Sequence, residues 1–132
     1  MKNNQPRIVH RTWDEVKAAA IWAASKMKVD GKMLNGVYGI PRGGACLAVL
    51  FSHLLKIEYL DKPREGCLIC DDIADTGQTL LQYKDLPGVT FYTDVAKETA
   101  RKQPDYYGKF IPELDADSTA WIEFPWEEPS KK

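Results

Sequence analysis

Residues 67–80 read Cys-Leu-Ile-Cys-Asp-Asp-Ile-Ala-Asp-Thr-Gly-Gln-Thr-Leu, and this stretch decides the fold. Its first four residues, 67–70, are apolar on both faces, which predicts a buried parallel strand. Two adjacent carboxylates, Asp71 and Asp72, follow this strand, and Asp75 comes three residues later. Open α/β sheets bind their ligands at the carboxyl ends of the strands, so we expect these acids to lie in a binding site.

The turn from Thr76 to Thr79 opens a predicted helix over residues 78–84. Backbone amides, two hydroxyls and a helix N-terminus together favour a phosphate dianion. Carboxylates beside it can accept hydrogen bonds from sugar hydroxyls or face a bound Mg²⁺. The turn lacks the Gly-Lys-Ser/Thr of a Walker A loop. The alternative, a plain strand-turn-helix with surface acids, leaves the paired carboxylates unexplained.

This stretch resembles the 5-phosphoribosyl-1-pyrophosphate (PRPP) signature of type I phosphoribosyltransferases. The resemblance implies that Asp71 and Asp72 hold the ribose and Mg²⁺, the expected cofactor. It also implies that Asp75 is the general base for a purine N–H, unless Asp75 only stabilises the loop. The residues implied in binding the 5′-phosphate are Ala74, Asp75, Thr76, Gly77, Gln78 and Thr79.

A second motif, Gly39-Ile40-Pro41-Arg42-Gly43-Gly44, lies at the end of a short apolar strand predicted over residues 36–40, with a tight loop over 41–44. Its two glycines allow the backbone to approach an anion, and Arg42 adds a permanent positive charge. In the family the equivalent loop binds pyrophosphate and often contains a cis peptide. The resemblance therefore assigns pyrophosphate to Pro41, Arg42, Gly43 and Gly44 and implies a cis Pro41–Arg42 bond. The alternative is a plain strand-to-helix turn.

Later segments, and the opening Thr12-Trp13-Asp14, resemble bacterial xanthine-guanine phosphoribosyltransferases in particular. The matching features are an Ala-Lys at a strand end (Lys97), Asp105-Tyr106, and Trp-Ile-Glu-Phe-Pro-Trp-Glu over residues 121–127. The resemblance implies a base site in which Lys97 donates to a 6-oxo group, which disfavours adenine. Trp121 would stack on the purine, a backbone carbonyl near Ile122 would read the exocyclic group at position 2, and Glu123 would help at that edge. The alternatives are a solvated surface lysine and a packing or interface tryptophan.

The rest of the chain predicts a mostly parallel twisted sheet with helices on both faces, closed by a minimal hood over the base. Thr12 and Glu15 form a capping box for a helix that runs to about residue 27. A second helix is expected over 45–55, with strands over 57–60, 88–96 and, more weakly, 106–111. Residues 115–118 are expected to be a loop and 130–132 a frayed tail.

The composition bounds the class of protein. A length of 132 residues suits one domain over 1–132, and a net charge of −1 gives no electrostatic case for nucleic acid or membrane partners. The polar N-terminus lacks an apolar signal core, so a cytoplasmic location is the default. Cys67 and Cys70 are three apart on a strand, so they should face opposite sides and be inert. A homo-oligomer, dimer or tetramer, is implied by the resemblance.

The chain departs from the family pattern in one place. Only residues 61–66 join the second strand to the signature strand, where family members carry a long mobile loop that closes over PRPP. Lys62 or Arg64 is a candidate to replace that lid, or a neighbouring subunit could cover the site. Two functions therefore stay open: a 6-oxopurine phosphoribosyltransferase of the purine salvage type, and a PRPP- or nucleotide-binding regulator on the same fold.

Overall fold

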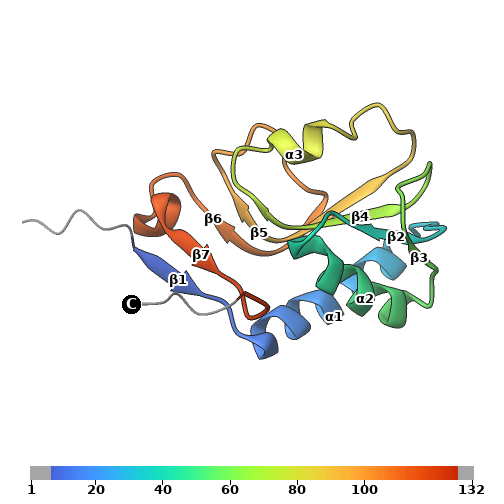
Figure 1. The fold of residues 1–132 in the computed structure, drawn as a ribbon, viewed down its shortest axis with the longest axis horizontal. Helices are drawn as coiled ribbons and strands as arrows, with labels where there is room; N and C mark the ends of the chain where they lie inside the picture. The colour runs from blue at the N-terminus through green and yellow to red at the C-terminus, as the bar shows by residue number, and fades with distance from the viewer. Residues whose placement is uncertain (1–6, 128–132) are drawn as a thin grey trace, which may run out of the picture.

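A parallel sheet of five strands forms the centre of the computed structural model, which describes residues 7–127 (Figure 1). Every pair of neighbouring strands runs in the same direction. In spatial order the strands are β3 (Tyr59–Leu60), β2 (Val37–Gly39), β4 (Leu68–Ala74), β5 (Thr90–Lys97) and β6 (Tyr106–Ile111). The frayed tail predicted at 130–132 lies outside the described residues.

Helices cover both faces of this sheet, as predicted. The long helices α1 (Trp13–Val29) and α2 (Gly43–Leu55) lie together on one face, and the short α3 (Gln78–Leu81) lies on the other (Figure 1). The capping box at the start of α1 is confirmed: Thr12 accepts from the Glu15 amide, and Glu15 accepts from the Thr12 amide. Among residues 7–127, no helix is both long enough and apolar enough to cross a membrane.

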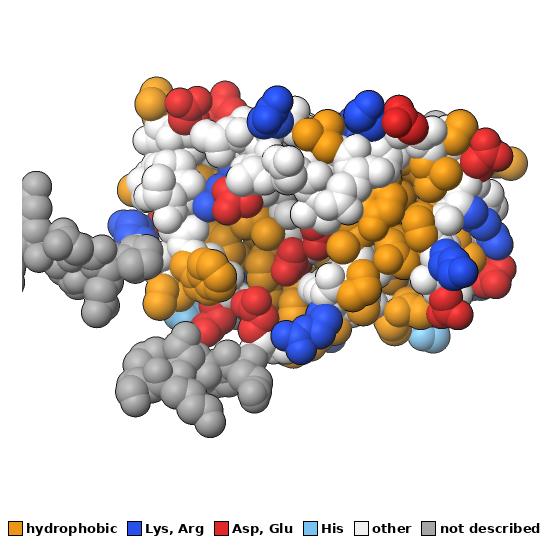
Figure 2. Space-filling view, turned by 45° about the horizontal axis from the view of Figure 1, so that its top comes forward, with side chains coloured by type: hydrophobic (Ala, Val, Ile, Leu, Met, Phe, Trp, Pro, Cys, Tyr) orange, Lys and Arg blue, Asp and Glu red, His pale blue; other side chains and the backbone are white. Residues whose placement is uncertain are grey.

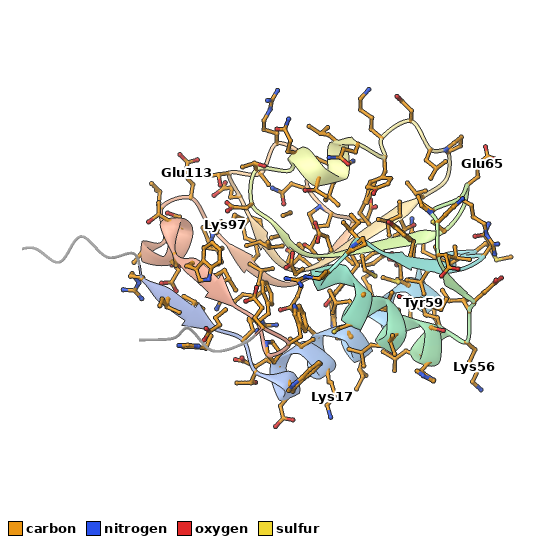
Figure 3. All side chains as sticks on the ribbon, in the orientation of Figure 1. Lys17, Lys56, Tyr59, Glu65, Lys97 and Glu113 are labelled. Atoms are coloured by element: carbon orange, nitrogen blue, oxygen red, sulfur yellow. The ribbon has the colours of Figure 1, made fainter. Side chains whose placement is uncertain are left out.

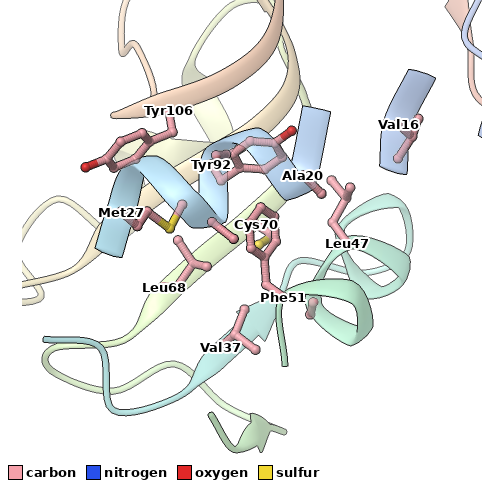
Figure 4. Packing of buried hydrophobic residues seen from close by; sticks show 13 residues of the cluster. Val16, Ala20, Met27, Val37, Leu47, Phe51, Leu68, Cys70, Tyr92 and Tyr106 are labelled. Atoms are coloured by element: carbon pink, nitrogen blue, oxygen red, sulfur yellow. The ribbon is translucent and has the colours of Figure 1, made fainter. Parts of the chain in front are cut away.

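The main core lies between the sheet and the two long helices (Figure 4). Phe51 of α2 packs edge-on against Tyr92 of β5, with ring centroids 4.7 Å apart. Strand alternation places Cys70 in this core and Cys67 in the smaller core on the α3 side. Both thiols are buried and unpaired, and burial raises the pKa of each. The prediction of opposite-facing, inert cysteines is therefore confirmed.

A second, two-stranded sheet joins the two ends of the chain: β1 (Ile8–His10) pairs in parallel with β7 (Trp121–Glu123). It stands beside the carboxyl ends of β5 and β6 and forms the small hood (Figure 1). A 3₁₀ turn, η1 (Ala116–Thr119), precedes it where a loop was expected. β1 was not predicted, because a three-residue strand gives little local signal.

Two predicted boundaries around the signature were wrong. The signature strand runs to Ala74 rather than residue 70, because Asp71, Ile73 and Ala74 continue the ladder with β5. The following helix ends at Leu81 rather than near residue 84, and looser turns carry the chain onward. The carboxylates Asp71 and Asp72 therefore lie within a strand and not in the loop after it.

The short connection between β3 and β4 folds back toward the amino edge of the sheet. Arg64 donates to the backbone and side-chain oxygens of Asn35 and pairs with Glu58 at 3.4 Å. Asn35 in turn donates to the Glu65 carbonyl. These contacts hold Arg64 away from the carboxyl edge of the sheet, so the idea that Arg64 replaces a lid was wrong.

Candidate active site

The predicted site residues converge at the carboxyl edge of β2, β4 and β5. A pocket of about 280 Å³ opens between the loop after β2 and the turn after β4. Figure 2 shows acidic side chains grouped near the middle of this side of the molecule, with basic ones beside them. The pocket is lined by Ile40, Pro41, Asp71, Asp72, Ile73, Ala74, Asp75, Thr76, Gly77, Thr79 and Leu80.

The adjacent carboxylates of β4 face two different surroundings. Asp71 is only 8% exposed, and its Oδ1 accepts the Asp72 amide at 2.8 Å. Burial, followed by the charge of Asp72, raises the pKa of Asp71 to about 7. Asp72 points instead toward Gly43 at the start of α2, where an added Cβ would overlap its Oδ2 atom. Both carboxyl groups line the pocket, so the pair offers oxygen acceptors to hydroxyl donors or to a cation.

The loop after β2 brings the start of α2 against β4. The peptide between Pro41 and Arg42 is cis, as the resemblance implied. Gly43 and Gly44, expected in a loop, form the first turn of α2. An added Cβ at Gly44 would overlap the Cys70 carbonyl, so this glycine is needed for helix-to-strand packing as well as for anion approach. Arg42 is exposed beside this contact.

The turn after β4 is built around Gly77, whose φ of +84° is left-handed. The Thr76 hydroxyl accepts the Gln78 amide at 3.2 Å, and the Thr76 carbonyl accepts the Arg101 amide at 2.8 Å. Because α3 has only four residues, its dipole is small and the predicted helix contribution was overstated. Backbone amides and hydroxyls of the turn remain the groups that could hold an anion.

Lys97 lies at the end of β5, between the turn after β4 and the hood. Its Nζ donates to the Ala120 carbonyl at 3.1 Å and lies 3.5 Å from Oδ1 of Asp75. The Lys97 side chain is only 5% exposed, whereas that of Asp75 is 57% exposed. Figure 3 shows Lys97 among the inner side chains of this region. The surface-lysine alternative is therefore wrong.

A second pocket, of about 500 Å³, adjoins the first through their shared residue Asp75. Its lining adds Lys97, the exposed ring of Trp121, and polar side chains of the segment before β7. Figure 3 places Glu113 at the outer margin of the molecule, so it belongs to the rim. The lining residues are Asp75, Lys97, Thr99, Glu113, Ser118, Thr119, Ala120 and Trp121.

Two predicted base-binding residues have side chains directed elsewhere. Ile122 is buried in the core beneath the hood. Glu123 pairs with Nδ1 of His10 at 2.7 Å, across the β1–β7 sheet. Neither side chain lines the second pocket, so the structure brings together Lys97 and Trp121 but not the side chains of Ile122 and Glu123. Alternation along β7 separates Ile122 from its two neighbours.

Sequence reasoning missed the hydroxyl groups of the second pocket and one buried ion pair. Thr99, Ser118 and Thr119 follow no motif, and only the folding of η1 against Lys97 brings them there. Arg11 and Asp94 form a doubly hydrogen-bonded pair at 2.8 and 2.9 Å. An acid in the interior of a predicted strand was the available signal for this pair.

Comparison with known proteins agrees with this arrangement. A xanthine-guanine phosphoribosyltransferase of Cereibacter sphaeroides is 30% identical over 148 aligned positions, covering 89% of this chain and 86% of that protein. The enzyme of the same name from Desulfotalea psychrophila is 27% identical, covering 99% and 93%. A purine phosphoribosyltransferase structure from Pyrococcus horikoshii superposes with a TM-score of 0.77 and 26% identity, covering 95% and 98%. No protein-family model matches the chain.

The chain has the fold of the type I phosphoribosyltransferases, with a parallel sheet, an acidic carboxyl edge and an adjoining pocket under a small hood. The relative that is 30% identical over 89% of the chain then assigns it to one family within this class. The chain belongs to the xanthine-guanine phosphoribosyltransferase family.

Proposed function

We propose that this protein transfers the 5-phosphoribosyl group of PRPP to a 6-oxopurine (xanthine, guanine or hypoxanthine) and releases pyrophosphate, a reaction of purine salvage. The observation that carries the proposal is the placement of Lys97. The buried ammonium group of Lys97 lines the second pocket, beside the exposed Trp121, and lies 3.5 Å from Asp75. Asp75 also lines the first pocket, whose acids and glycine turn suit a phosphorylated sugar. Family membership supports the same reaction.

PRPP is assigned to the first pocket and its flanking loop. Asp71 and Asp72 accept hydrogen bonds from the ribose hydroxyls. The turn from Ala74 to Thr79 surrounds the 5′-phosphate with amides and hydroxyls. Pro41, Arg42, Gly43 and Gly44 hold the pyrophosphate, where the guanidinium of Arg42 offsets its charge. Each part of the substrate thereby meets a group of matching polarity.

The adjacent carboxylates of Asp71 and Asp72 also fit Mg²⁺. Their oxygens are the hard ligands that Mg²⁺ prefers, and a bound cation would offset the burial and the neighbouring charge that raise the pKa of Asp71. Within residues 7–127, no group of three or more His, Cys, Asp or Glu side chains is arranged to hold a metal. Mg²⁺ is commonly bound by one or two carboxylates together with substrate phosphates and water, so two acids suffice. When bound, it supplies positive charge against the departing pyrophosphate.

The base is assigned to the second pocket. The Lys97 ammonium has donors only, so it favours a 6-oxo group over the 6-amino group of adenine. Trp121 offers an exposed ring face for stacking on the purine. Backbone groups near Ile122 remain candidates to read the opposite edge, while the Glu123 side chain is engaged by His10.

Asp75 is the proposed general base, because it is the residue common to both pockets. As the bond from ribose C1 to the pyrophosphate oxygen breaks, a bond from the purine nitrogen to C1 forms. The proton of the purine N–H then passes to the Asp75 carboxylate. Such assistance contributes about 10²–10⁴-fold to a rate. Positioning and electrostatic stabilisation of the leaving group supply the remainder.

The decisive experiment measures pyrophosphate release with PRPP, Mg²⁺ and each of xanthine, guanine, hypoxanthine, adenine and orotate. We expect turnover with 6-oxopurines and little with adenine or orotate. Asp75→Asn should lower kcat while leaving PRPP affinity within about twofold, as expected for loss of a base. Asp85→Asn is the matched control, since the Asp85 side chain is 92% exposed. Equal losses of kcat and PRPP affinity in Asp75→Asn would remove the base role.

A PRPP- or nucleotide-binding regulator is the second candidate, and the short 61–67 connection favours it. A connection of this length forms no lid, and closure over the substrate normally excludes water. Tight PRPP binding, with no pyrophosphate released from PRPP in the presence of any of the five bases, would favour this function over the enzyme.

Assembly as a dimer or tetramer and a cytoplasmic location are also proposed. Exposed apolar side chains on or beside α1, including Ile21, Trp22, Val29 and Met33, support an assembly surface. Sedimentation at several protein concentrations tests the first of these, and localisation of a tagged full-length chain tests the second.

A further inference from the structure

The buried ion pair between Arg11 and Asp94 has no role in the reaction described above. The two groups make a bidentate contact, with the Arg11 side chain 8% exposed and that of Asp94 fully buried. Bidentate arginine–carboxylate contacts fix both distance and orientation, unlike apolar packing. The pair therefore defines one geometry between the segments that carry it.

Those segments are the hood and the central sheet. Arg11 directly follows β1, and its own amide donates to the Glu123 carbonyl of β7 at 2.9 Å. At the other end of the hood, the Trp121 amide donates to the Arg7 carbonyl at 2.8 Å. Asp94 lies within β5, three residues before Lys97. A restraint on Arg11 is thus passed through two hydrogen-bonded strands to Trp121.

The strand β5 is tied to the hood region at two points. The first is Asp94, which accepts both hydrogen bonds from Arg11, and the second is Lys97. Lys97 bonds the Ala120 carbonyl, which directly precedes Trp121. Between them, Val95 packs against Ile122 in the core beneath the hood. Apolar contact alone would let the small sheet slide or tilt, and the polar contacts oppose this.

We propose that Arg11 and Asp94 are positioning residues for the base site. Their ion pair holds the β1–β7 sheet so that the ring of Trp121 stays at the spacing from Lys97 that a purine requires. The role rests on the proposed function, because it assumes that the base binds between these two side chains. Neither member of the pair lines either of the two pockets.

The test uses two variants and a matched control. Arg11→Lys keeps the charge but loses the bidentate contact. The double variant Arg11→Met/Asp94→Leu removes both charges at similar bulk, a change that often leaves stability intact. Arg64→Lys is the control, because the Arg64 side chain also donates to a carboxylate, that of Glu58, but lies at the far edge of the sheet.

Steady-state kinetics should separate positioning from stability. We expect both variants to raise KM for the base about tenfold or more, as misplacement of a binding group does, while KM for PRPP stays within about twofold. Amide hydrogen exchange should quicken at Arg11 and Trp121 but not in β4. The control should leave all three readouts unchanged.

Three results would overturn the proposal: an unchanged KM for the base in Arg11→Lys, equal increases in both KM values, or a wild-type KM for the base in the double variant. A wild-type KM for the base in the double variant would mean that apolar packing at these two positions holds the base site equally well, so that the ion pair is not needed for positioning. If Arg11→Lys does not fold, the double variant decides. If the wild-type protein releases no pyrophosphate, the proposed function fails, and hydrogen exchange alone then decides whether the pair holds the hood.

Discussion

Replacing Lys97 by methionine removes the ammonium group while keeping a side chain of similar length. In the structure this group makes one hydrogen bond, to the Ala120 carbonyl, and one ion pair, to Asp75. The change therefore takes away the proposed donor to the purine 6-oxo group without opening a large cavity. It also frees Asp75 from its positive neighbour.

The size of the effect follows from burial. A hydrogen bond to a charged group contributes about 1.5–3 kcal/mol, which corresponds to roughly 10- to 150-fold in kcat/KM for the base. Because the Lys97 side chain is only 5% exposed, bulk water has little access to replace it, and the upper half of that range is expected. Stability should change by less than about 2 kcal/mol, since removing a buried charge offsets the lost hydrogen bond.

The assay is pyrophosphate release with the base and PRPP varied in turn. Lys97→Met should lower kcat/KM for guanine, xanthine and hypoxanthine, raise the activity with adenine relative to these bases, and leave KM for PRPP within about twofold. Lys84→Met serves as control, because the Lys84 side chain is 61% exposed and lines neither pocket. Unchanged kcat/KM for the 6-oxopurines, or a parallel loss of PRPP affinity, would refute the assignment of Lys97 to the base.

Three further changes test the loop, a helix and the acid pair. Gly77→Ala forces an alanine into φ +84° against neighbouring backbone, so it should cost about 1–3 kcal/mol of stability and weaken PRPP binding. Gly31→Ala is the control: it lies at φ +74° with open space around it, so it should cost less stability and leave PRPP binding unchanged. Urea denaturation compares the stabilities of the two variants, and titration with PRPP compares their affinities. Thr12→Ala removes the cap of α1 and should lower the free energy of unfolding by about 1 kcal/mol with kcat unchanged, a prediction that an unaltered thermal midpoint would contradict. The pKa of Asp71 rises from its usual 3.8 to about 7, so the folded protein keeps a proton that the unfolded chain has lost, and the free energy of unfolding should fall as pH rises from about 4 to 7 without ligand. Asp71→Asn should flatten this dependence of the free energy of unfolding on pH. Denaturation at successive pH values measures it, and an equally steep dependence in the variant would refute the assignment to Asp71.

Local chemistry explains why much of the site could be predicted. The apolar run 67–70, the acids after it and the Gly77 turn each depend on neighbours within a few residues. The cis bond at Pro41–Arg42 came from the resemblance and is confirmed. The end of β4 was misjudged, because acids such as Asp71 are normally strand-breaking and only pairing with β5 keeps them in the ladder.

Contacts between distant segments explain what the local pattern did not predict. Glu123 was assigned to the base, but its partner His10 comes from the other end of the chain through the β1–β7 pairing. Arg64 was a lid candidate, but Asn35 and Glu58 hold it at the amino edge. No periodicity within either segment carries information about such partners.

By itself, the sequence determined the order of the alternating elements, the buried signature strand and the kinds of group offered to a phosphosugar, because these depend on side-chain period and turn chemistry over short stretches. Only the tertiary structure decided that Lys97 is buried between Asp75 and Ala120, that Trp121 stands over the second pocket, and that Arg11 and Asp94 join the hood to the sheet. Those relations are set by the packing of two sheets against each other, and burial then determines how strongly each charge acts.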